Sequence, residues 1–122
     1  MRTVLIVEDT DLCRETLELA LARVANIEVR AVTTAEEALE HLDDDICALV
    51  TDLRLPSMSG FDLIEAVRSL PRSRAFPILV TSGDTDPRTP SRLAKMGVAA
   101  YFPKPYSPAE VRSKLEQLIH AC

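Results

Sequence analysis

Residues 46–52, Ile-Cys-Ala-Leu-Val-Thr-Asp, form an apolar run that ends in a carboxylate. In an open sheet of parallel strands, ligands bind at the carboxyl ends of the strands. Four runs share this pattern: Val4–Val7 leads to Glu8 and Asp9, Ile46–Val50 to Asp52, Phe76–Val80 to Ser82, and Ala99–Phe102 to Lys104. We therefore expect these side chains to meet in one pocket, whose three carboxylates, hydroxyl and ammonium suit a divalent cation and a phosphoryl group.

Strand and helix patterns alternate five times along the chain, which is typical of an α/β domain with a parallel sheet. Apolar periodicity, capping residues and prolines set the expected limits. We predict strands at Thr3–Val7, Ile27–Val32, Ile46–Thr51, Phe76–Thr81 and Ala99–Phe102, and helices at Asp11–Val24, Thr34–Leu42, Gly60–Leu70, Ser91–Met96 and from Pro108 to about His120. In the first helix, the expected buried face holds Leu12, Leu17, Leu21 and Val24.

The strand sequences also indicate the order of the sheet. The first, third and fourth strands are continuous apolar runs, as expected where helices cover both faces. Ile27–Val32 begins with alternating apolar and charged residues, and the fifth strand is followed by Pro103, so both are expected at edges. These features predict a flavodoxin-like, doubly wound (βα)5 sandwich with the strand order 2-1-3-4-5.

Length and composition predict one soluble domain spanning residues 1–122. The longest apolar runs have four or five residues, whereas a membrane span needs roughly 20, so no membrane role is expected. The net charge is -5 without a basic stripe, which argues against direct nucleic-acid binding. The 3 cysteines are odd in number and form no C-x-x-C motif, so we expect a reducing, cytoplasmic location.

Three acids carry most of the chemical signal. A strand-end carboxylate such as Asp52 can attack phosphorus and form an acyl phosphate, although taken alone it could simply cap a loop. Glu8 and Asp9 would repel each other in the same cleft unless a hard cation such as Mg²⁺ offset their charges. They could instead cap the following helix, but Thr10 and Asp11 are available for that role.

Ser82 and Lys104 supply the remaining polar groups. The serine offers a hydroxyl to a phosphoryl oxygen, and Gly83 beside it permits close approach of the backbone. Lysine binds phosphates as a point charge, and a cis Lys104–Pro105 bond would direct the ammonium into the pocket. Each residue alone is equally compatible with an ordinary turn, so the hypothesis depends on their joint placement.

At these motifs the chain resembles the receiver domain of two-component response regulators, over essentially all 122 residues. The matching segments are Leu5-Ile-Val-Glu-Asp9, Thr51-Asp-Leu-Arg-Leu-Pro-Ser-Met-Ser-Gly60, Val80-Thr-Ser-Gly83 and Tyr101-Phe-Pro-Lys-Pro105. The resemblance implies that Asp52 is the phosphoacceptor and that Lys104 contacts the phosphate. It implies Ser82 as the switch hydroxyl and Tyr101 as the switch aromatic. The implied ligands of Mg²⁺, for which Mn²⁺ could substitute, are Glu8, Asp9, Asp52 and the main-chain carbonyl of Arg54.

The resemblance also implies partners. The phosphoryl donor would be a phosphohistidine on a sensor histidine kinase or a histidine phosphotransfer protein. The surface of the fourth helix, fifth strand and fifth helix would control a downstream protein target or effector domain, and a homodimer is left open. No effector domain is expected within residues 1–122. We therefore expect a phosphoacceptor that assists its own phosphorylation and dephosphorylation rather than a conventional enzyme.

Two features depart from the usual pattern of that family. Arg54 lies two residues past the phosphoacceptor and Asp84 two past the switch serine, so an Arg54–Asp84 ion pair is expected to screen attacking water. Residues 84–90 contain two prolines where the fourth helix often begins. We expect a mobile loop there, followed by Thr89 as N-cap and Pro90 at the first helical position.

Three other functions match parts of the sequence. A phosphatase of the haloacid dehalogenase type also uses a strand-end Asp, but it needs a second Asp where this chain has Arg54. A flavodoxin-like ligand binder is poorly supported, because the chain has only 3 glycines and lacks both a G-x-G-x-x-G motif and a P-loop. A degenerate receiver that binds partners without phosphorylation stays open, although the acid set is complete.

Overall fold

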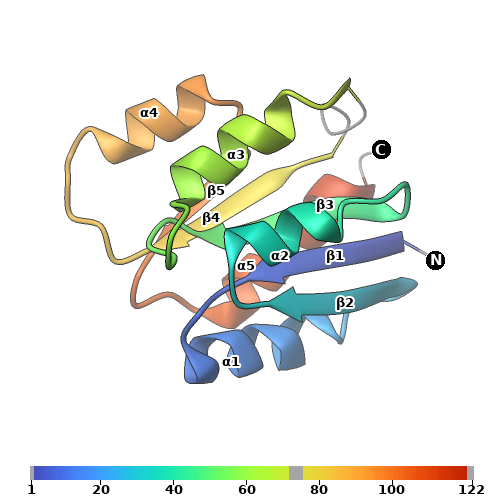
Figure 1. The fold of residues 1–122 in the computed structure, drawn as a ribbon. Helices are drawn as coiled ribbons and strands as arrows, with labels where there is room; N and C mark the ends of the chain where they lie inside the picture. Colours follow the sequence, from blue (N-terminus) through green and yellow to red (C-terminus); the bar gives the residue numbers. More distant parts are fainter. Residues whose placement is uncertain (1, 72–75, 121–122) are drawn as a thin grey trace.

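A computed structural model describes residues 2–71 and 76–120, and its strands and helices alternate as expected (Figure 1). The elements are β1 (Arg2–Val7), α1 (Asp11–Leu21), β2 (Ile27–Val32), α2 (Ala35–Glu40), β3 (Ile46–Asp52), α3 (Gly60–Arg68), β4 (Ile78–Ser82), α4 (Thr89–Lys95), β5 (Ala100–Pro103) and α5 (Pro108–His120).

The five strands form one parallel sheet in the order β2-β1-β3-β4-β5, which confirms the predicted topology. The apolar side chains of β1, β3 and β4 are buried or nearly so, because helices cover both faces of these strands. β2 and β5 are the edges and are only half-buried along most of their length. The alternation of β2 and the proline at the end of β5 were therefore correct indicators of edge strands.

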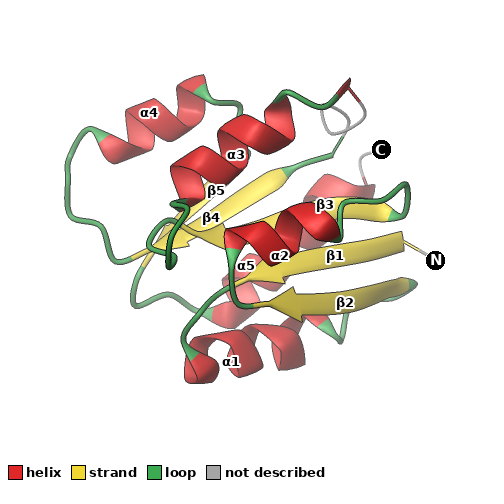
Figure 2. Ribbon diagram, in the orientation of Figure 1, coloured by secondary structure: helices red, strands yellow, loops and turns green. Residues whose placement is uncertain are grey.

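Helices lie on both sides of the sheet, α1 and α5 against one face and α2, α3 and α4 against the other (Figures 1 and 2). Each face has its own core of buried aliphatic side chains. β1 lies between β2 and β3. The chain therefore leaves β1 toward β2 and leaves β3 in the opposite direction along the sheet, and these two connections turn to opposite faces. The carboxyl ends of these two strands mark the position where such folds bind ligands.

The first helix is shorter than predicted, and one residue of its predicted buried face, Leu12, is exposed, whereas Leu17, Leu21 and Val24 are buried. α1 ends at Leu21 because the next turn is tight, with hydrogen bonds from Arg23 N–H to the Ala20 carbonyl and from Val24 N–H to the Leu21 carbonyl. Leu12, which we placed on the buried face, is 73% exposed. It lies five positions before the buried Leu17, about 1.4 helical turns, so the two side chains cannot share a face.

Helix α4 begins at Thr89, two residues before the predicted range of Ser91–Met96 and one residue before Pro90. Thr89 is its first residue and Arg88 is the N-cap, so the assignment of Thr89 as N-cap and of Pro90 to the first position is wrong. The Thr89 hydroxyl instead donates to a carboxylate oxygen of Asp84. Other differences are small: α2 ends at Glu40, α3 ends at Arg68, and β4 begins at Ile78.

In the described ranges, 2–71 and 76–120, no helix combines the length and the apolar sequence needed to cross a bilayer.

Candidate functional site

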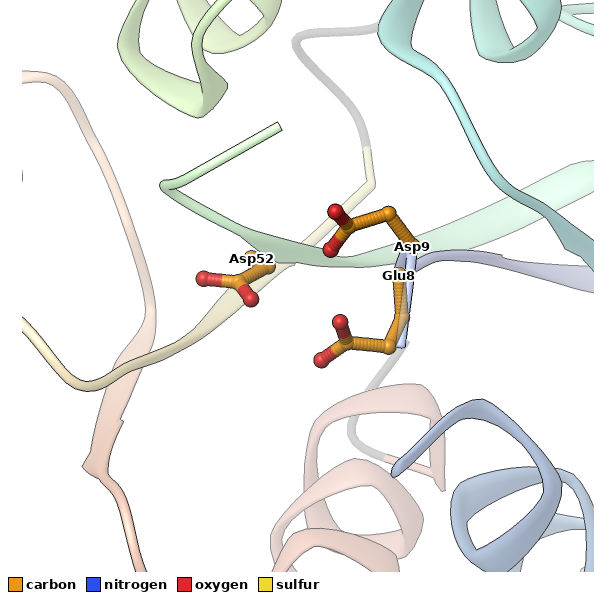
Figure 3. A group of neighbouring side chains, drawn as sticks. All are labelled: Glu8, Asp9 and Asp52. Atoms are coloured by element: carbon orange, nitrogen blue, oxygen red, sulfur yellow. The ribbon is translucent and has the colours of Figure 1, made fainter. Parts of the chain in front are cut away.

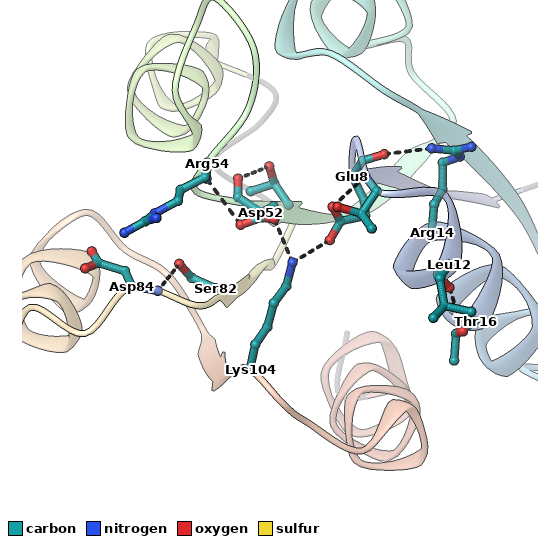
Figure 4. A network of polar contacts seen from close by, with 11 residues as sticks. Glu8, Leu12, Arg14, Thr16, Asp52, Arg54, Ser82, Asp84 and Lys104 are labelled. Atoms are coloured by element: carbon teal, nitrogen blue, oxygen red, sulfur yellow. Dashed lines mark hydrogen bonds and ion pairs between the residues drawn. The ribbon is translucent and has the colours of Figure 1, made fainter.

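Most of the predicted site residues gather at the carboxyl ends of the strands (Figure 4). The end of β1 lies beside β3, with Val7 opposite Thr51. At the end of β3, Asp52 lies opposite Thr81 of β4. Ser82 lies opposite Pro103 of β5. Side chains that follow these positions therefore meet although they are distant in the sequence.

Three carboxylates come together there, from Glu8, Asp9 and Asp52 (Figure 3). One oxygen from each lies within 4.8 Å of the others. Glu8 and Asp52 are buried whereas Asp9 is exposed, so solvent reaches the cluster from the Asp9 side. Burial raises the pKa of Glu8, and the hydrogen bond from Lys104 only partly opposes that rise.

Lys104 joins the two buried acids. Its Nζ lies 2.9 Å from Glu8 Oε1 and 2.8 Å from Asp52 Oδ2 (Figure 4). Burial alone would lower the pKa of Lys104, but its hydrogen bonds to Asp52 and Glu8 outweigh this and raise it. The ammonium is therefore charged and offsets part of the acids' repulsion. The Lys104–Pro105 bond is cis, which is the form expected to direct the ammonium into the pocket.

Backbone amides bind the other oxygens of the two buried acids. Thr10 N–H donates to Glu8 Oε2 at 3.1 Å, and Arg54 N–H donates to Asp52 Oδ1 at 3.2 Å. Across the described part of the chain, every buried side-chain nitrogen and oxygen has a hydrogen-bond partner. The carboxylates are thus held in place by contacts from the segments that follow β1, β3 and β5, rather than by one local turn.

The start of α3 packs directly on the backbone of Asp52. Gly60 N–H donates to the Leu53 carbonyl at 2.8 Å. A Cβ atom at Gly60 would lie 2.2 Å from the main-chain oxygen of Asp52 and 2.6 Å from Leu53 Cα, closer than any real contact. The absence of a side chain at Gly60 is therefore required for α3 to approach the end of β3.

Ser82 is fully buried at the end of β4, and its Oγ accepts a hydrogen bond from Asp84 N–H at 3.0 Å. The Asp84 carboxylate accepts from Asp86 N–H at 2.9 Å and from Thr89 Oγ1 at 2.7 Å. These hydrogen bonds, that from Asp86 first, lower the pKa of Asp84. The Tyr101 hydroxyl lies 3.4 Å from the main-chain oxygen of Asp84, to which it donates.

Arg54 and Asp84 lie on neighbouring loops, and the Arg54 side chain extends toward Asp84 (Figure 4). Between these two described residues there is no ion pair within 4.0 Å. The guanidinium nevertheless helps, as the smallest contribution, to lower the pKa of Asp84. Their role in screening water stays a prediction, as does the mobility of the loop that contains Asp84.

Two contacts of the site were missed by sequence reasoning. Arg14 Nη1 donates to the main-chain oxygen of Glu8 at 3.2 Å and so fixes the end of β1 against α1. Its position six residues after Glu8, early in a helix, was the available signal. Thr89 was considered only as a helix cap, and the pairing of its hydroxyl with Asp84 depends on the shape of the intervening loop.

Comparison with known proteins places this geometry in a family. Residues 4–116 match the response regulator receiver domain. The chain is 34% identical over 110 residues to the two-component response regulator ORR13 of Oryza sativa subsp. japonica, covering 88% of this chain and 90% of the relative. It is 32% identical over 117 residues to the chemotaxis protein CheY1 of Helicobacter pylori, covering 94% of each chain.

Solved structures agree with the sequence comparisons. A response regulator receiver protein from Pseudomonas putida superposes with a TM-score of 0.84 at 32% identity, over 95% of this chain and 96% of that one. The non-phosphorylated HemR receiver domain from Leptospira biflexa gives a TM-score of 0.85 at 29% identity, over 98% and 94% of the two chains. The chain therefore belongs to the response regulator receiver domain family.

Proposed function

We propose that this protein is a phosphorylation-activated switch, in which Asp52 accepts a phosphoryl group from a phosphohistidine. The donor would be a sensor histidine kinase or a histidine phosphotransfer protein. One observation carries the proposal: a buried strand-end carboxylate accepts a hydrogen bond from a lysine ammonium inside a cluster of three acids. A loop-capping aspartate would need neither the ammonium nor the other acids.

The acid cluster fits a hard divalent cation. Oxygens of Glu8, Asp9 and Asp52 lie close enough together to share one ion, and the Arg54 main-chain carbonyl would complete the protein ligands. Mg²⁺ is the proposed ion and Mn²⁺ a substitute; when bound, it would offset the like charges and stabilise negative charge on the phosphoryl oxygens. The exposed Asp9 leaves a route by which an ion can enter from solvent.

The chain's own residues supply the remaining chemistry. An Asp52 oxygen forms a bond to phosphorus as the phosphorus–nitrogen bond of the donor histidine breaks, so the phosphoryl group is transferred without oxidation or reduction. Lys104, which contacts Asp52 Oδ2, is placed to stabilise charge on a phosphoryl oxygen. The protein thus assists its own phosphorylation and dephosphorylation without turning over a separate substrate.

We propose that the signal leaves the site through Ser82 and Tyr101. Ser82 Oγ would contact the phosphoryl group, and Tyr101 would change its rotamer in response. The phosphoryl group shifts this equilibrium only as far as its contacts differ between the two states. The affected surface, formed by α4, β5 and α5, would control a downstream protein target or effector domain, and self-association is one way it could act.

Two further proposals concern lifetime and location. Arg54 and Asp84 flank the site, and we propose that they modulate how fast water removes the phosphoryl group. An unchanged phosphoryl lifetime in Arg54→Ala would remove this role.

We propose a cytoplasmic location because kinase partners and unpatterned cysteines both suit a reducing compartment.

The deciding experiment is incubation with acetyl phosphate and Mg²⁺, read by intact mass. We expect a phosphate-sized adduct on the wild type, its loss in Asp52→Ala, and its retention in Asp45→Ala. Asp45 is a suitable control because it is an exposed acid just before β3, at the opposite end of that strand. If no adduct forms with either acetyl phosphate or a phosphotransfer protein, the phosphoacceptor proposal fails and a degenerate receiver is favoured.

A further inference from the structure

Asp84 connects three elements that surround the proposed phosphorylation site. Its N–H donates to Ser82 Oγ at the end of β4, and its main-chain oxygen accepts from the Tyr101 hydroxyl on β5. Its carboxylate accepts from Thr89 Oγ1, on the first residue of α4. One residue therefore contacts the switch serine, the switch aromatic and the start of a helix on the proposed output surface. Figure 4 shows the first of these contacts, between Asp84 and Ser82.

The contact with Thr89 is the best defined of the three. At 2.7 Å it has the length of a hydrogen bond from a hydroxyl to an ionised acid, whereas the Tyr101 contact is long at 3.4 Å. The Thr89 side chain is only 3% exposed, so few alternative partners can replace the carboxylate. Moreover, the N-cap residue Arg88 makes no side-chain cap hydrogen bond. The first turn of α4 is thus tied to the loop through Thr89.

Movement of Ser82 has a direct consequence for Asp84. When Ser82 Oγ turns toward a phosphoryl group on Asp52, the hydrogen bond from Asp84 N–H must either follow it or break. In the first case Asp84 moves with Ser82, and in the second it loses its contact with the end of β4. Either change alters how the acceptor of the Thr89 hydroxyl is held. Asp86 N–H also donates to the Asp84 carboxylate, so the loop before α4 responds together with it.

We propose that Asp84 and Thr89 are positioning residues that transmit the state of Ser82 to helix α4. The path runs from Ser82 Oγ through the Asp84 main chain and carboxylate to the Thr89 hydroxyl. This inference rests on the proposed function, because it needs a phosphoryl group on Asp52. It assigns Asp84 a structural partner in α4, in addition to any effect that Arg54 and Asp84 have on water.

The test uses beryllofluoride with Mg²⁺, because beryllofluoride bound to Asp52 stands in for the phosphoryl group. Backbone amide signals would be followed by NMR, with Gly83 reporting on the switch serine and Leu93 on α4. Thr89→Val removes the hydroxyl but keeps the side-chain shape, and Thr89→Ser keeps the hydroxyl as the matched control. We expect both amides to shift in the wild type and in Thr89→Ser, and only Gly83 to shift in Thr89→Val.

A Leu93 shift in Thr89→Val as large as in the wild type would overturn the inference. If Thr89→Val does not fold, Asp84→Ala gives the second test, since it removes the acceptor and should likewise separate the Leu93 shift from the Gly83 shift. Failure of the underlying function gives a different result: neither Gly83 nor Leu93 would shift in the wild type. That outcome would remove both proposals together.

Discussion

The loops after β3 and β4 both present a site residue, but they are held in different ways. The β3–α3 loop, residues 53–59, is fixed mainly by packing of backbone on backbone, with Gly60 set against Asp52 and Leu53. The β4–α4 loop, residues 83–88, is held largely by side-chain acceptors, those of Asp84 and Asp86.

This difference matches the roles proposed for the two strand ends. Close packing is costly to change, because atoms in contact cannot approach further. Hydrogen bonds in a partly exposed loop can be exchanged for others at a small net free energy. The proposed phosphoacceptor, Asp52, thus has a fixed position, whereas Ser82 lies next to a loop that can rearrange.

The largest expected effect on stability comes from Gly60, and Gly83, which borders the other loop, serves as its control. Gly60→Ala would force a methyl group into the Asp52 and Leu53 backbone, so we expect the free energy of unfolding to fall by about 3 kcal/mol or more. Gly83→Ala is the control, because a Cβ there has no atom within 4 Å. It should change stability by less than about 1 kcal/mol. Urea denaturation measures both, and equal losses would contradict the comparison.

An intermediate effect is expected at Lys104. Lys104→Gln removes the ammonium from Glu8 and Asp52 and leaves two buried acids facing each other, so we expect a loss of about 2 kcal/mol. Urea denaturation in buffer with EDTA measures the free energy of unfolding without contribution from bound metal. The double variant Lys104→Gln/Asp52→Asn should lose less than the sum of its single variants. Additive losses would show that the ammonium does not act through Asp52.

The smallest effect concerns the helix caps. The Ser59 hydroxyl accepts from Asp62 N–H at the start of α3, and Ser59→Ala should lower the free energy of unfolding by about 1 kcal/mol. At the corresponding place in α4, Arg88 makes no side-chain cap hydrogen bond, so Arg88→Ala should cost less than Ser59→Ala. The same denaturation assay compares them, and the reverse order would show that α4 depends on Arg88 in a way that its contacts do not indicate.

Much of the fold was predictable because its signals are local. Continuous apolar runs indicated interior strands, and alternation indicated the β2 edge. Thr34, where the second helix was predicted to begin, is the N-cap of α2 and accepts from Glu37 N–H. The error at Leu12 lies in the assignment of helix faces. Leu12 was grouped with Leu17 and Leu21, but its side chain lies on another face of the helix and points to solvent.

The candidate site was predictable in its members but not in its contacts. Glu8, Asp52 and Lys104 could be grouped because all follow strands of one parallel sheet. The sequence does not show that Lys104 bridges the two acids or that Thr89 binds Asp84. Both contacts depend on side-chain directions that are set by distant segments.

By itself, the sequence determined which residues form strands, which strands lie inside the sheet, and which acids, hydroxyl and ammonium stand at the strand ends. These features follow from local hydrophobicity and from the pleat, in which every second residue faces the same side. Only the tertiary structure decided that Arg14 supports Glu8, that Gly60 must lack a side chain, and that Asp84 joins β4 to α4. The physical reason is that each of these contacts joins segments whose relative position is fixed only when the sheet and helices pack together.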